Sequence, residues 1–194
     1  MKIGFAPLYF ERSTVALLDL NGVVSGESDR ALNGADPVDW RAGTPGFAEG
    51  VTDSPYAPMR TDIVVGADPA SASRNVADVV VNPNDNTVTG VRSPRWDPSG
   101  RDRLIYLEEG IQASFVLADI SSVTTIKKQA GGRVRRAEWM PDGSAIVALE
   151  EHPSTAPLAV WVYDADARLL IDALFLPNAD NSGYSLSDLA PRAY

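Results

Sequence analysis

The feature of this sequence that most limits its possible folds is a segment that occurs twice, 43 residues apart. The first copy runs from Ser93 to Gly100 and reads SPRWDPSG, and the second runs from Ala137 to Gly143 and reads AEWMPDG. An aliphatic stretch ending in two glutamates follows each copy, and then a second apolar stretch ending in an aspartate. Self-similarity at one spacing is typical of repeat architectures.

Three pairs of positions keep nearly the same spacing and define the repeat. They are Trp96 and Trp139, Leu107 and Leu149, and Asp119 and Asp164. The offsets are 43, 42 and 45 residues respectively. Three anchors at almost one offset indicate a duplicated structural unit rather than a chance match.

A fainter third copy is predicted upstream. It places Tyr56 or Ala57 where the other copies have tryptophan, and it matches Val65 and Asp78 with the aliphatic and acidic anchors. A half-copy opens the chain and puts Asp19 at the position of the acidic anchor. The repeat is therefore predicted to extend over most of the chain, with two clear copies and one weak copy.

Each unit is predicted to consist of short β-strands. The stretches after the tryptophans are rich in Leu, Ile and Val and are bounded by turn residues. Pro-Ser-Gly and Pro-Asp-Gly are turn tripeptides, because proline fixes φ and glycine accepts a positive φ. A unit of about 40 residues with four short strands is typical of a propeller blade.

The two clear copies resemble the TolB-type (WD40-like) β-propeller repeat, in which Pro-x-Trp-Ser-Pro-Asp-Gly precedes an aliphatic strand. The first copy departs from it by Ser99 in place of aspartate, and the second lacks the leading proline. The resemblance implies an all-β fold, a β-propeller whose blades are four-stranded antiparallel sheets. Typical members have six or seven blades, whereas a chain of 194 residues has room for about four, so a small or partial propeller is predicted. The resemblance implies nothing specific about function, since propellers have many unrelated roles.

The chain is predicted to form a single domain made of successive segments. These are a half blade at 1–24, a long non-blade loop at 25–53, blades at 54–91, 93–134 and 137–176, and a C-terminal closing segment or arm at 177–194. Two arrangements remain open. Either the two termini close the ring within one chain, or the ring is incomplete and is finished by a second copy or a partner.

Composition excludes several classes of function. The chain has no cysteine, one histidine and a net charge of −9. Thiolate chemistry, cysteine-based metal centres and multi-histidine sites are thereby excluded, and a general nucleic-acid or anionic-membrane binder is disfavoured. We find no stretch that predicts a membrane span or signal peptide. The sequence predicts a protein that is not an enzyme and needs no cofactor or metal.

Candidate reactive groups have a structural interpretation that we prefer. Glu108-Glu109 and Glu150-Glu151 recur with the repeat, so they are predicted to be solvated strand ends rather than a hydrolase pair. His152 is interpreted as a residue of a rim loop. The segment 178–183 resembles the start of a calcium loop, but its twelfth position is Leu189 instead of glutamate.

Three groups of residues are candidates for an interface. The first group, Trp40 and Phe47, consists of large apolar residues inside the predicted loop, which anchor it either on its own domain or on a neighbour. The second is a cluster of cations that suits an acidic partner or is a solvated rim: Lys127, Lys128, Arg133, Arg135 and Arg136. The third is Trp161, a candidate for stacking on a glycan, whereas Trp96 and Trp139 are predicted to lie in the core.

These features together favour a structural or interaction protein without catalysis. The preferred hypothesis is a multi-copy component of a larger assembly, such as a viral or phage particle, that docks through its loops and termini. The alternative is a free ligand-binding propeller for carbohydrate or peptide, and a glycosidase-like enzyme is less favoured. The predicted partners are proteins or further copies of the chain, with a glycan as another option, and neither nucleic acid nor membrane.

Overall fold

A computed structural model of the chain shows an all-β protein. It describes residues 2–5, 16–19, 21–27, 31–33, 38–43, 46–54, 60–68, 73–82, 84–85, 87–122, 124–128, 132–151 and 159–175. Sixteen strands and no helix lie in these ranges. Consequently none of their elements is a helix long and apolar enough to cross a membrane.

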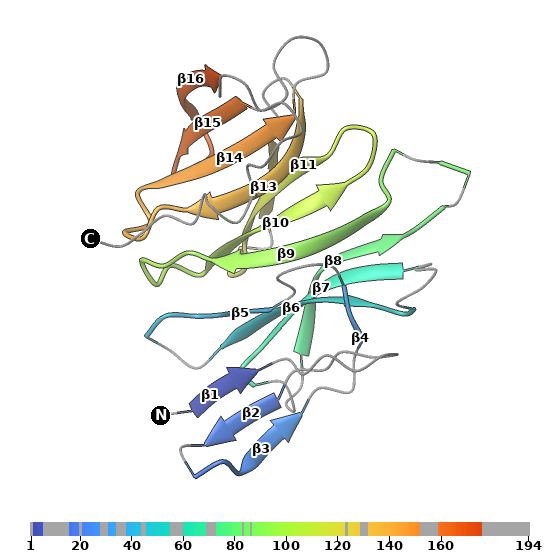
Figure 1. Cartoon of the computed structure of the whole chain (residues 1–194), viewed down its shortest axis with the longest axis vertical. Coiled ribbons are helices and arrows are strands. Elements are labelled where there is room, and N and C mark those ends of the chain that lie inside the picture. The colour runs from blue at the N-terminus through green and yellow to red at the C-terminus, as the bar shows by residue number, and fades with distance from the viewer. Residues whose placement is uncertain are drawn as a thin grey trace, which may run out of the picture.

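The strands form four antiparallel sheets that follow one another along the chain (Figure 1), which we number 1 to 4. Sheet 1 contains β1 (Lys2–Phe5), β2 (Ala16–Asp19) and β3 (Val24–Glu27). Sheet 2 contains β4 (Ala31–Leu32), β5 (Val38–Trp40), β6 (Phe47–Thr52), β7 (Arg60–Gly66) and β8 (Ser73–Val80). The short strands β4 and β5 both pair with β6, so together they form one interrupted edge of sheet 2.

Sheets 3 and 4 have the four-stranded order expected for propeller blades. Sheet 3 contains β9 (Gly90–Trp96), β10 (Arg103–Glu109), β11 (Ser114–Asp119) and β12 (Thr124–Lys128). Sheet 4 contains β13 (Arg133–Trp139), β14 (Ala145–Glu151), β15 (Ala159–Asp164) and β16 (Leu169–Phe175). In each sheet the strands pair in chain order, which is the simple meander of a blade.

The sheets are stacked as an open arc. The strand β9 packs on sheet 2, and β13 packs on sheet 3, so the first strands of sheets 3 and 4 each contact the preceding sheet. Sheet 1 and sheet 4 lie at opposite ends of the longest axis of the molecule (Figure 1). The described strands therefore form a partial propeller rather than a ring closed within one chain. The predicted closing segment 177–194 lies outside the described residues.

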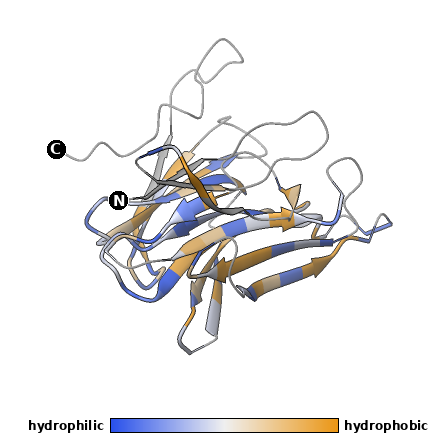
Figure 2. Ribbon diagram, turned by 90° about the horizontal axis from the view of Figure 1, so that it is seen from below, coloured by the Kyte–Doolittle hydropathy of each residue, from blue (hydrophilic) through white to orange (hydrophobic). Residues whose placement is uncertain are grey.

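Apolar side chains at equivalent positions hold neighbouring sheets together. Ala48 and Val65 of sheet 2 pack against sheet 3, and Ile105 and Leu117 of sheet 3 pack against sheet 4. Both pairs are directly opposed on adjacent strands, so they lie on one face of their sheet. Figure 2 shows the hydrophobic colour concentrated along the strands. Each face that meets a neighbour is thus an apolar stripe, which drives the stacking.

The predicted loop at 25–53 is wrong, because three strands, β4, β5 and β6, lie within it and β3 ends in it. The sequence of β6 does not show the alternation of apolar and polar residues that indicates a strand, because Glu49 is fully buried and Gly50 has no side chain. The structural counterpart of Trp96 and Trp139 is consequently Trp40 rather than Tyr56, which lies outside the described residues. Each of these tryptophans is paired with the first or second residue of the following strand.

Longer connections explain why the upstream copy is displaced. Residues 67–72 join β7 to β8 and residues 81–89 join β8 to β9, whereas 120–123 and 129–132 are the matching links after β11 and β12. Counted across the sheet from the edge formed by β4 and β5, Val65 lies on the third strand, β7. Leu107 lies on the second strand of sheet 3, β10, so the predicted match between the two residues is wrong. The sheets begin at residues 31, 90 and 133 instead of 54, 93 and 137.

The turn glycine of the second repeat copy is predicted to be essential for close packing. Gly143 has φ of +70°, and a Cβ there would lie 2.6 Å from Asp97 Oδ1 and 2.8 Å from Ser99 Cβ. We expect Gly143→Ala to lower the free energy of unfolding by about 1–3 kcal/mol in a denaturant titration. Gly100→Ala is the matched control, because Gly100 has φ of +83° but nothing within 4 Å of such a Cβ. An equal loss in both variants would contradict crowding at Gly143.

Candidate functional site

Three tryptophans mark equivalent places on edge strands of sheets 2, 3 and 4. Trp40, Trp96 and Trp139 are the last residues of β5, β9 and β13. Trp96 and Trp139 are each 6% exposed, so their predicted place in the core is confirmed by their burial. Trp40 is 37% exposed. The same position thus provides two structural indoles and one that solvent reaches.

A repeated clamp fixes the two buried tryptophans. An arginine of one sheet stacks on the tryptophan of the next sheet and also forms an ion pair with an aspartate there. The clamps are Arg41 with Trp96 and Asp102, and Arg103 with Trp139 and Asp166. The guanidinium carbons lie 5.2 and 5.5 Å from the ring centroids, and the ion-pair distances are 3.1 and 3.0 Å. Cation–π contact and charge pairing thus join sheet 2 to sheet 3 and sheet 3 to sheet 4.

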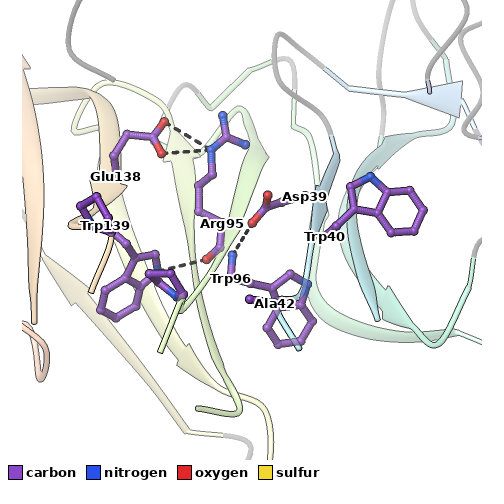
Figure 3. A pocket seen from close by; sticks show the side chains of 9 residues that line it. Asp39, Trp40, Ala42, Arg95, Trp96, Glu138 and Trp139 are labelled. Carbon is purple, nitrogen blue, oxygen red and sulfur yellow. Dashed lines mark hydrogen bonds and ion pairs between the residues drawn. The ribbon is translucent and has the colours of Figure 1, made fainter. Parts of the chain in front are cut away.

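A pocket of about 380 Å³ lies where these three strands end (Figure 3). Besides the tryptophans, it is lined by the residue that precedes each of them, and these residues are Asp39, Arg95 and Glu138. In Figure 3 the Trp40 ring lies to one side, apart from the other two indoles. The pocket therefore combines a buried aromatic wall, an exposed aromatic lip and a row of charges that alternate in sign.

Hydrogen bonds order the charged groups of the pocket. The Glu138 carboxylate accepts hydrogen bonds from Arg95 Nε, at 3.1 and 3.2 Å, and from Arg136 Nε, at 3.0 Å. Trp139 donates its Nε1–H to the carbonyl oxygen of Arg95 at 3.2 Å. Because Arg95 belongs to sheet 3 and Glu138 to sheet 4, their ion pair crosses the junction of the two sheets.

Asp39 has a different environment. Its Oδ2 accepts the backbone N–H of Trp96 at 2.6 Å. Burial raises the pKa of this carboxyl above its usual value, although the Trp96 hydrogen bond and the Arg95 charge oppose the rise. The ionised form of Asp39 is thus incompletely solvated, and an additional hydrogen-bond donor from a ligand would favour it.

The lining residues define what the pocket can do chemically. The described residues that line it include no Ser, Thr, Cys, Lys or His, and its two carboxylates, Asp39 and Glu138, already accept hydrogen bonds from Trp96 and from Arg95 and Arg136. Within the described ranges no cluster of three or more His, Cys, Asp or Glu side chains is placed to hold a metal ion. The pocket offers stacking, apolar contact and directed hydrogen bonds, which are the means of recognition.

The structure separates the predicted aromatic interface residues. Trp40 lines the pocket, whereas Phe47 is fully buried beneath it with 6.3 Å between the ring centroids. Phe47 therefore anchors its own domain, and its prediction as a residue that contacts a partner is wrong. Trp161 is partly buried against the core between sheets 3 and 4 and does not line the pocket.

The predicted basic cluster is largely neutralised within the chain. Three of its cations are ion-paired with glutamates: Lys127 with Glu108, Arg135 with Glu151, and Arg136 with Glu138. Lys128 ends β12 and Arg133 begins β13, so the cluster spans the link between sheets 3 and 4. Its role in docking an acidic partner stays a prediction, with less unpaired charge than the sequence suggests.

The paired glutamates are not uniformly solvated, which corrects their interpretation. Glu150 is 1% exposed, and its Oε2 accepts the Gly132 N–H at 2.9 Å. Burial and the neighbouring Glu150 charge raise the pKa of Tyr163, whose hydroxyl lies 3.4 Å from Glu150 Oε1. Glu109 forms an ion pair with Arg92 at 2.5 Å. His152 and the calcium-like segment 178–183 lie outside the described residues.

The charged residues of the pocket were missed by sequence reasoning. A signal for them exists, since each directly precedes a repeat tryptophan. It becomes visible only when Trp40 is aligned with Trp96 and Trp139, which the unequal connections of sheet 2 obscure.

Comparison with known proteins identifies the fold. No protein-family model and no curated protein matches the sequence. The structure is similar to TolB from Acinetobacter baumannii, with 14% identity and a TM-score of 0.64 over 90% of this chain and 40% of that one. It is also similar to the Dos1 propeller, with 12% identity and a TM-score of 0.55 over 84% of this chain and 42% of that one.

A chain of the mitotic checkpoint complex is similar as well, with 14% identity and a TM-score of 0.56 over 91% of this chain and 54% of that one. The chain thus spans about half or less of each of these solved propellers. Its fold is a partial β-propeller, similar to TolB and to other WD40-like propellers. The low identities show the fold alone.

Proposed function

We propose that this protein is a non-catalytic interaction scaffold that binds a segment of a partner protein in the pocket formed by Trp40, Asp39, Arg95 and Glu138. The single observation that carries the proposal is the half-exposed Trp40 ring beside a row of ordered charges. Tryptophan and arginine are the residues most often responsible for binding energy at protein interfaces. The described lining residues include no Ser, Thr, Cys, Lys or His, and both lining carboxylates are engaged in hydrogen bonds, which supports recognition.

Preorganisation of the pocket supports the same proposal. Trp40 rests on the buried Phe47, and Arg95 is held by Glu138 across two sheets. Groups that are already ordered lose little conformational entropy when a ligand binds. The three strands that carry them belong to different sheets, so a ligand in the pocket contacts several blades of one rigid frame at once.

The test is selection of peptides from a random phage-displayed library on the full chain, followed by titration of the selected peptides by fluorescence anisotropy. Trp40→Ala is expected to weaken binding by at least about tenfold, because loss of a hot-spot tryptophan costs about 2 kcal/mol or more. The matched control is Met140→Ala, since Met140 is also 37% exposed and does not line the pocket. Failure to select any peptide, or binding that Trp40→Ala leaves unchanged, would refute the proposal.

One observation favours carbohydrate as a second candidate ligand. An exposed indole beside carboxylates is a suitable stacking platform for a sugar ring. A glycan array probed with the full chain tests this, and a signal that disappears in Trp40→Ala but persists in Met140→Ala would assign the pocket to a glycan.

The proposal of a multi-copy component of a viral or phage particle is a narrower form of the scaffold function. The support for it is that the described strands form an open arc rather than a closed ring. Electron microscopy of the purified chain tests it, because such a component is expected to form regular particles or arrays.

A further inference from the structure

Two asparagines of the chain are directly followed by glycine. The two dipeptides are Asn21-Gly22 and Asn33-Gly34, and every other asparagine precedes a residue that carries a side chain. Asn-Gly is typical of tight turns, but it also has a chemical reactivity of its own. Because glycine has no Cβ, its backbone nitrogen can approach the side-chain carbonyl carbon of the preceding asparagine. The sequence therefore contains two sites for the same intramolecular reaction, and the structure distinguishes them.

Asn21 and Gly22 lie in the exposed connection between β2 and β3. All four residues from 21 to 24 are exposed. Gly22 has a φ of +81°, and among the described residues nothing lies within 4 Å of a Cβ built on it. Sheet 1, which carries this connection, is at one end of the arc (Figure 1). Solvent thus reaches both residues, and the space beside Gly22 is open.

Asn33 has a different environment. It directly follows β4 and is half-buried. Its Nδ2 donates to the Val91 carbonyl oxygen of sheet 3 at 2.8 Å, and its backbone N–H donates to the Gly50 carbonyl oxygen of sheet 2 at 2.8 Å. Deamidation removes Nδ2 as ammonia, so at Asn33 the reaction also breaks the bond to Val91. A residue tied to two sheets in this way reaches the reactive geometry only when the structure opens locally.

We propose that Asn21 is a site of spontaneous deamidation in the folded protein. The Gly22 backbone nitrogen attacks Cγ of Asn21 and loses its proton. A bond forms between this nitrogen and Cγ, the bond between Cγ and Nδ2 breaks, and ammonia leaves. Water then adds to either carbonyl of the resulting succinimide ring and opens it, which gives aspartate or isoaspartate. Water is the co-reactant, and neither step is a redox reaction.

Deamidation changes both the charge and the main chain at this turn. Each product adds one carboxylate to a chain whose net charge is −9. Isoaspartate also adds a carbon atom to the main chain, because the peptide bond to Gly22 then runs through the former side chain. Leu18 and Val24 are paired across this connection. Since the register of a hairpin depends on the length of its turn, isoaspartate is expected to weaken the pairing of β2 with β3.

The test is incubation of the full chain in neutral buffer, followed by digestion with trypsin and mass spectrometry. Cleavage after Arg12, Arg30 and Arg41 places the two asparagines in separate peptides, 13–30 and 31–41. Conversion of an amide to an acid raises the mass of a peptide by about 1 Da. In the folded chain Asn21 is expected to react at least about tenfold faster than Asn33, because the hydrogen bonds of Asn33 oppose the reaction.

The same chain unfolded in guanidinium chloride is the matched control. Because the two dipeptides are identical, the two rates are expected to lie within about threefold of each other once the structure is lost. In a second control, Asn21→Gln is expected to abolish the mass gain of peptide 13–30, since glutamine would have to close a larger ring.

Two outcomes would overturn the proposal. One is a rate at Asn21 in the folded chain that exceeds the rate at Asn33 by less than about tenfold. The other is a mass gain of peptide 13–30 that persists in Asn21→Gln. Either result leaves the proposed ligand pocket unaffected, since neither asparagine lines it.

Discussion

Trp139→Ala is expected to lower the free energy of unfolding by about 3–5 kcal/mol, as measured by urea denaturation. The indole is 6% exposed and packs in the core between sheets 3 and 4. Its removal leaves a cavity, deprives the Arg95 carbonyl of the indole N–H donor and removes the ring on which Arg103 stacks. Because these contacts join sheets 3 and 4, their loss is expected to weaken the packing between the two sheets and not only the local turn.

Met140→Ala provides the control for this prediction. Met140 is the next residue in the chain and is 37% exposed, so truncation there is expected to change the stability by about 0.5 kcal/mol or less. A loss below about 1 kcal/mol in Trp139→Ala would place the indole outside the core and contradict the stacking of sheets described above.

The all-β propeller fold was predictable because sheets 3 and 4 have nearly equal connections. Trp96 and Trp139 stand at the same place in the two sheets, and the turns that follow them use proline and glycine in the same way. Equal lengths preserve the spacing of the repeat, and a repeat of four short strands corresponds to few architectures. Local sequence was therefore sufficient to predict these two blades.

Sheet 2 was not predictable in the same way, for two physical reasons. Its longer connections put Trp40 56 residues before Trp96, so the fixed spacing fails. Its strand β6 contains the buried Glu49, and this charged residue makes the sequence of the strand resemble that of a polar loop. A buried carboxylate depends on surroundings that other parts of the chain provide, and alternation of hydropathy does not reveal it.

The pocket was even less accessible to sequence reasoning. Asp39, Arg95 and Glu138 meet only because their strands are packed side by side by contacts between whole sheets. Sequence reasoning selected Trp40 from its size and polar context, and it selected the cations from their density. It had no information on ion pairing, which neutralises Lys127 and Arg135 within the chain.

Asp97→Ala is expected to be as damaging as loss of Trp139, with about 3–5 kcal/mol removed from the free energy of unfolding. Asp97 is fully buried, and its carboxylate accepts the Ser99 N–H at 2.9 Å and ion-pairs with Arg101 at 2.7 Å and Arg103 at 3.0 Å. Removing it leaves Arg103, whose side chain is 12% exposed, with less compensation for its charge. Arg103 is also the arginine that stacks on Trp139, so both predictions concern one junction.

Asp166→Ala is the matched control, because Asp166 is the other ion-pair partner of Arg103 and its side chain is 61% exposed. Its removal is expected to cost about 0.5 kcal/mol, the usual value of an exposed pair. Comparable losses of unfolding free energy in the two variants would contradict a larger contribution from the buried carboxylate of Asp97.

The pH dependence provides an independent measurement at the same residue. Burial opposes ionisation of Asp97, but hydrogen bonds from Ser99, Arg101 and Arg103 outweigh it and hold its pKa below the usual 3.8. Asp97 therefore contributes stability above that value, and the contribution is lost as the pH falls through the lowered pKa. Asp97→Asn, which keeps the shape and loses the charge, is expected to be less stable than wild type at pH 7. Since wild type loses the contribution of the ionised carboxylate in acid, the difference between the two stability curves is expected to shrink as the pH falls below 3.8.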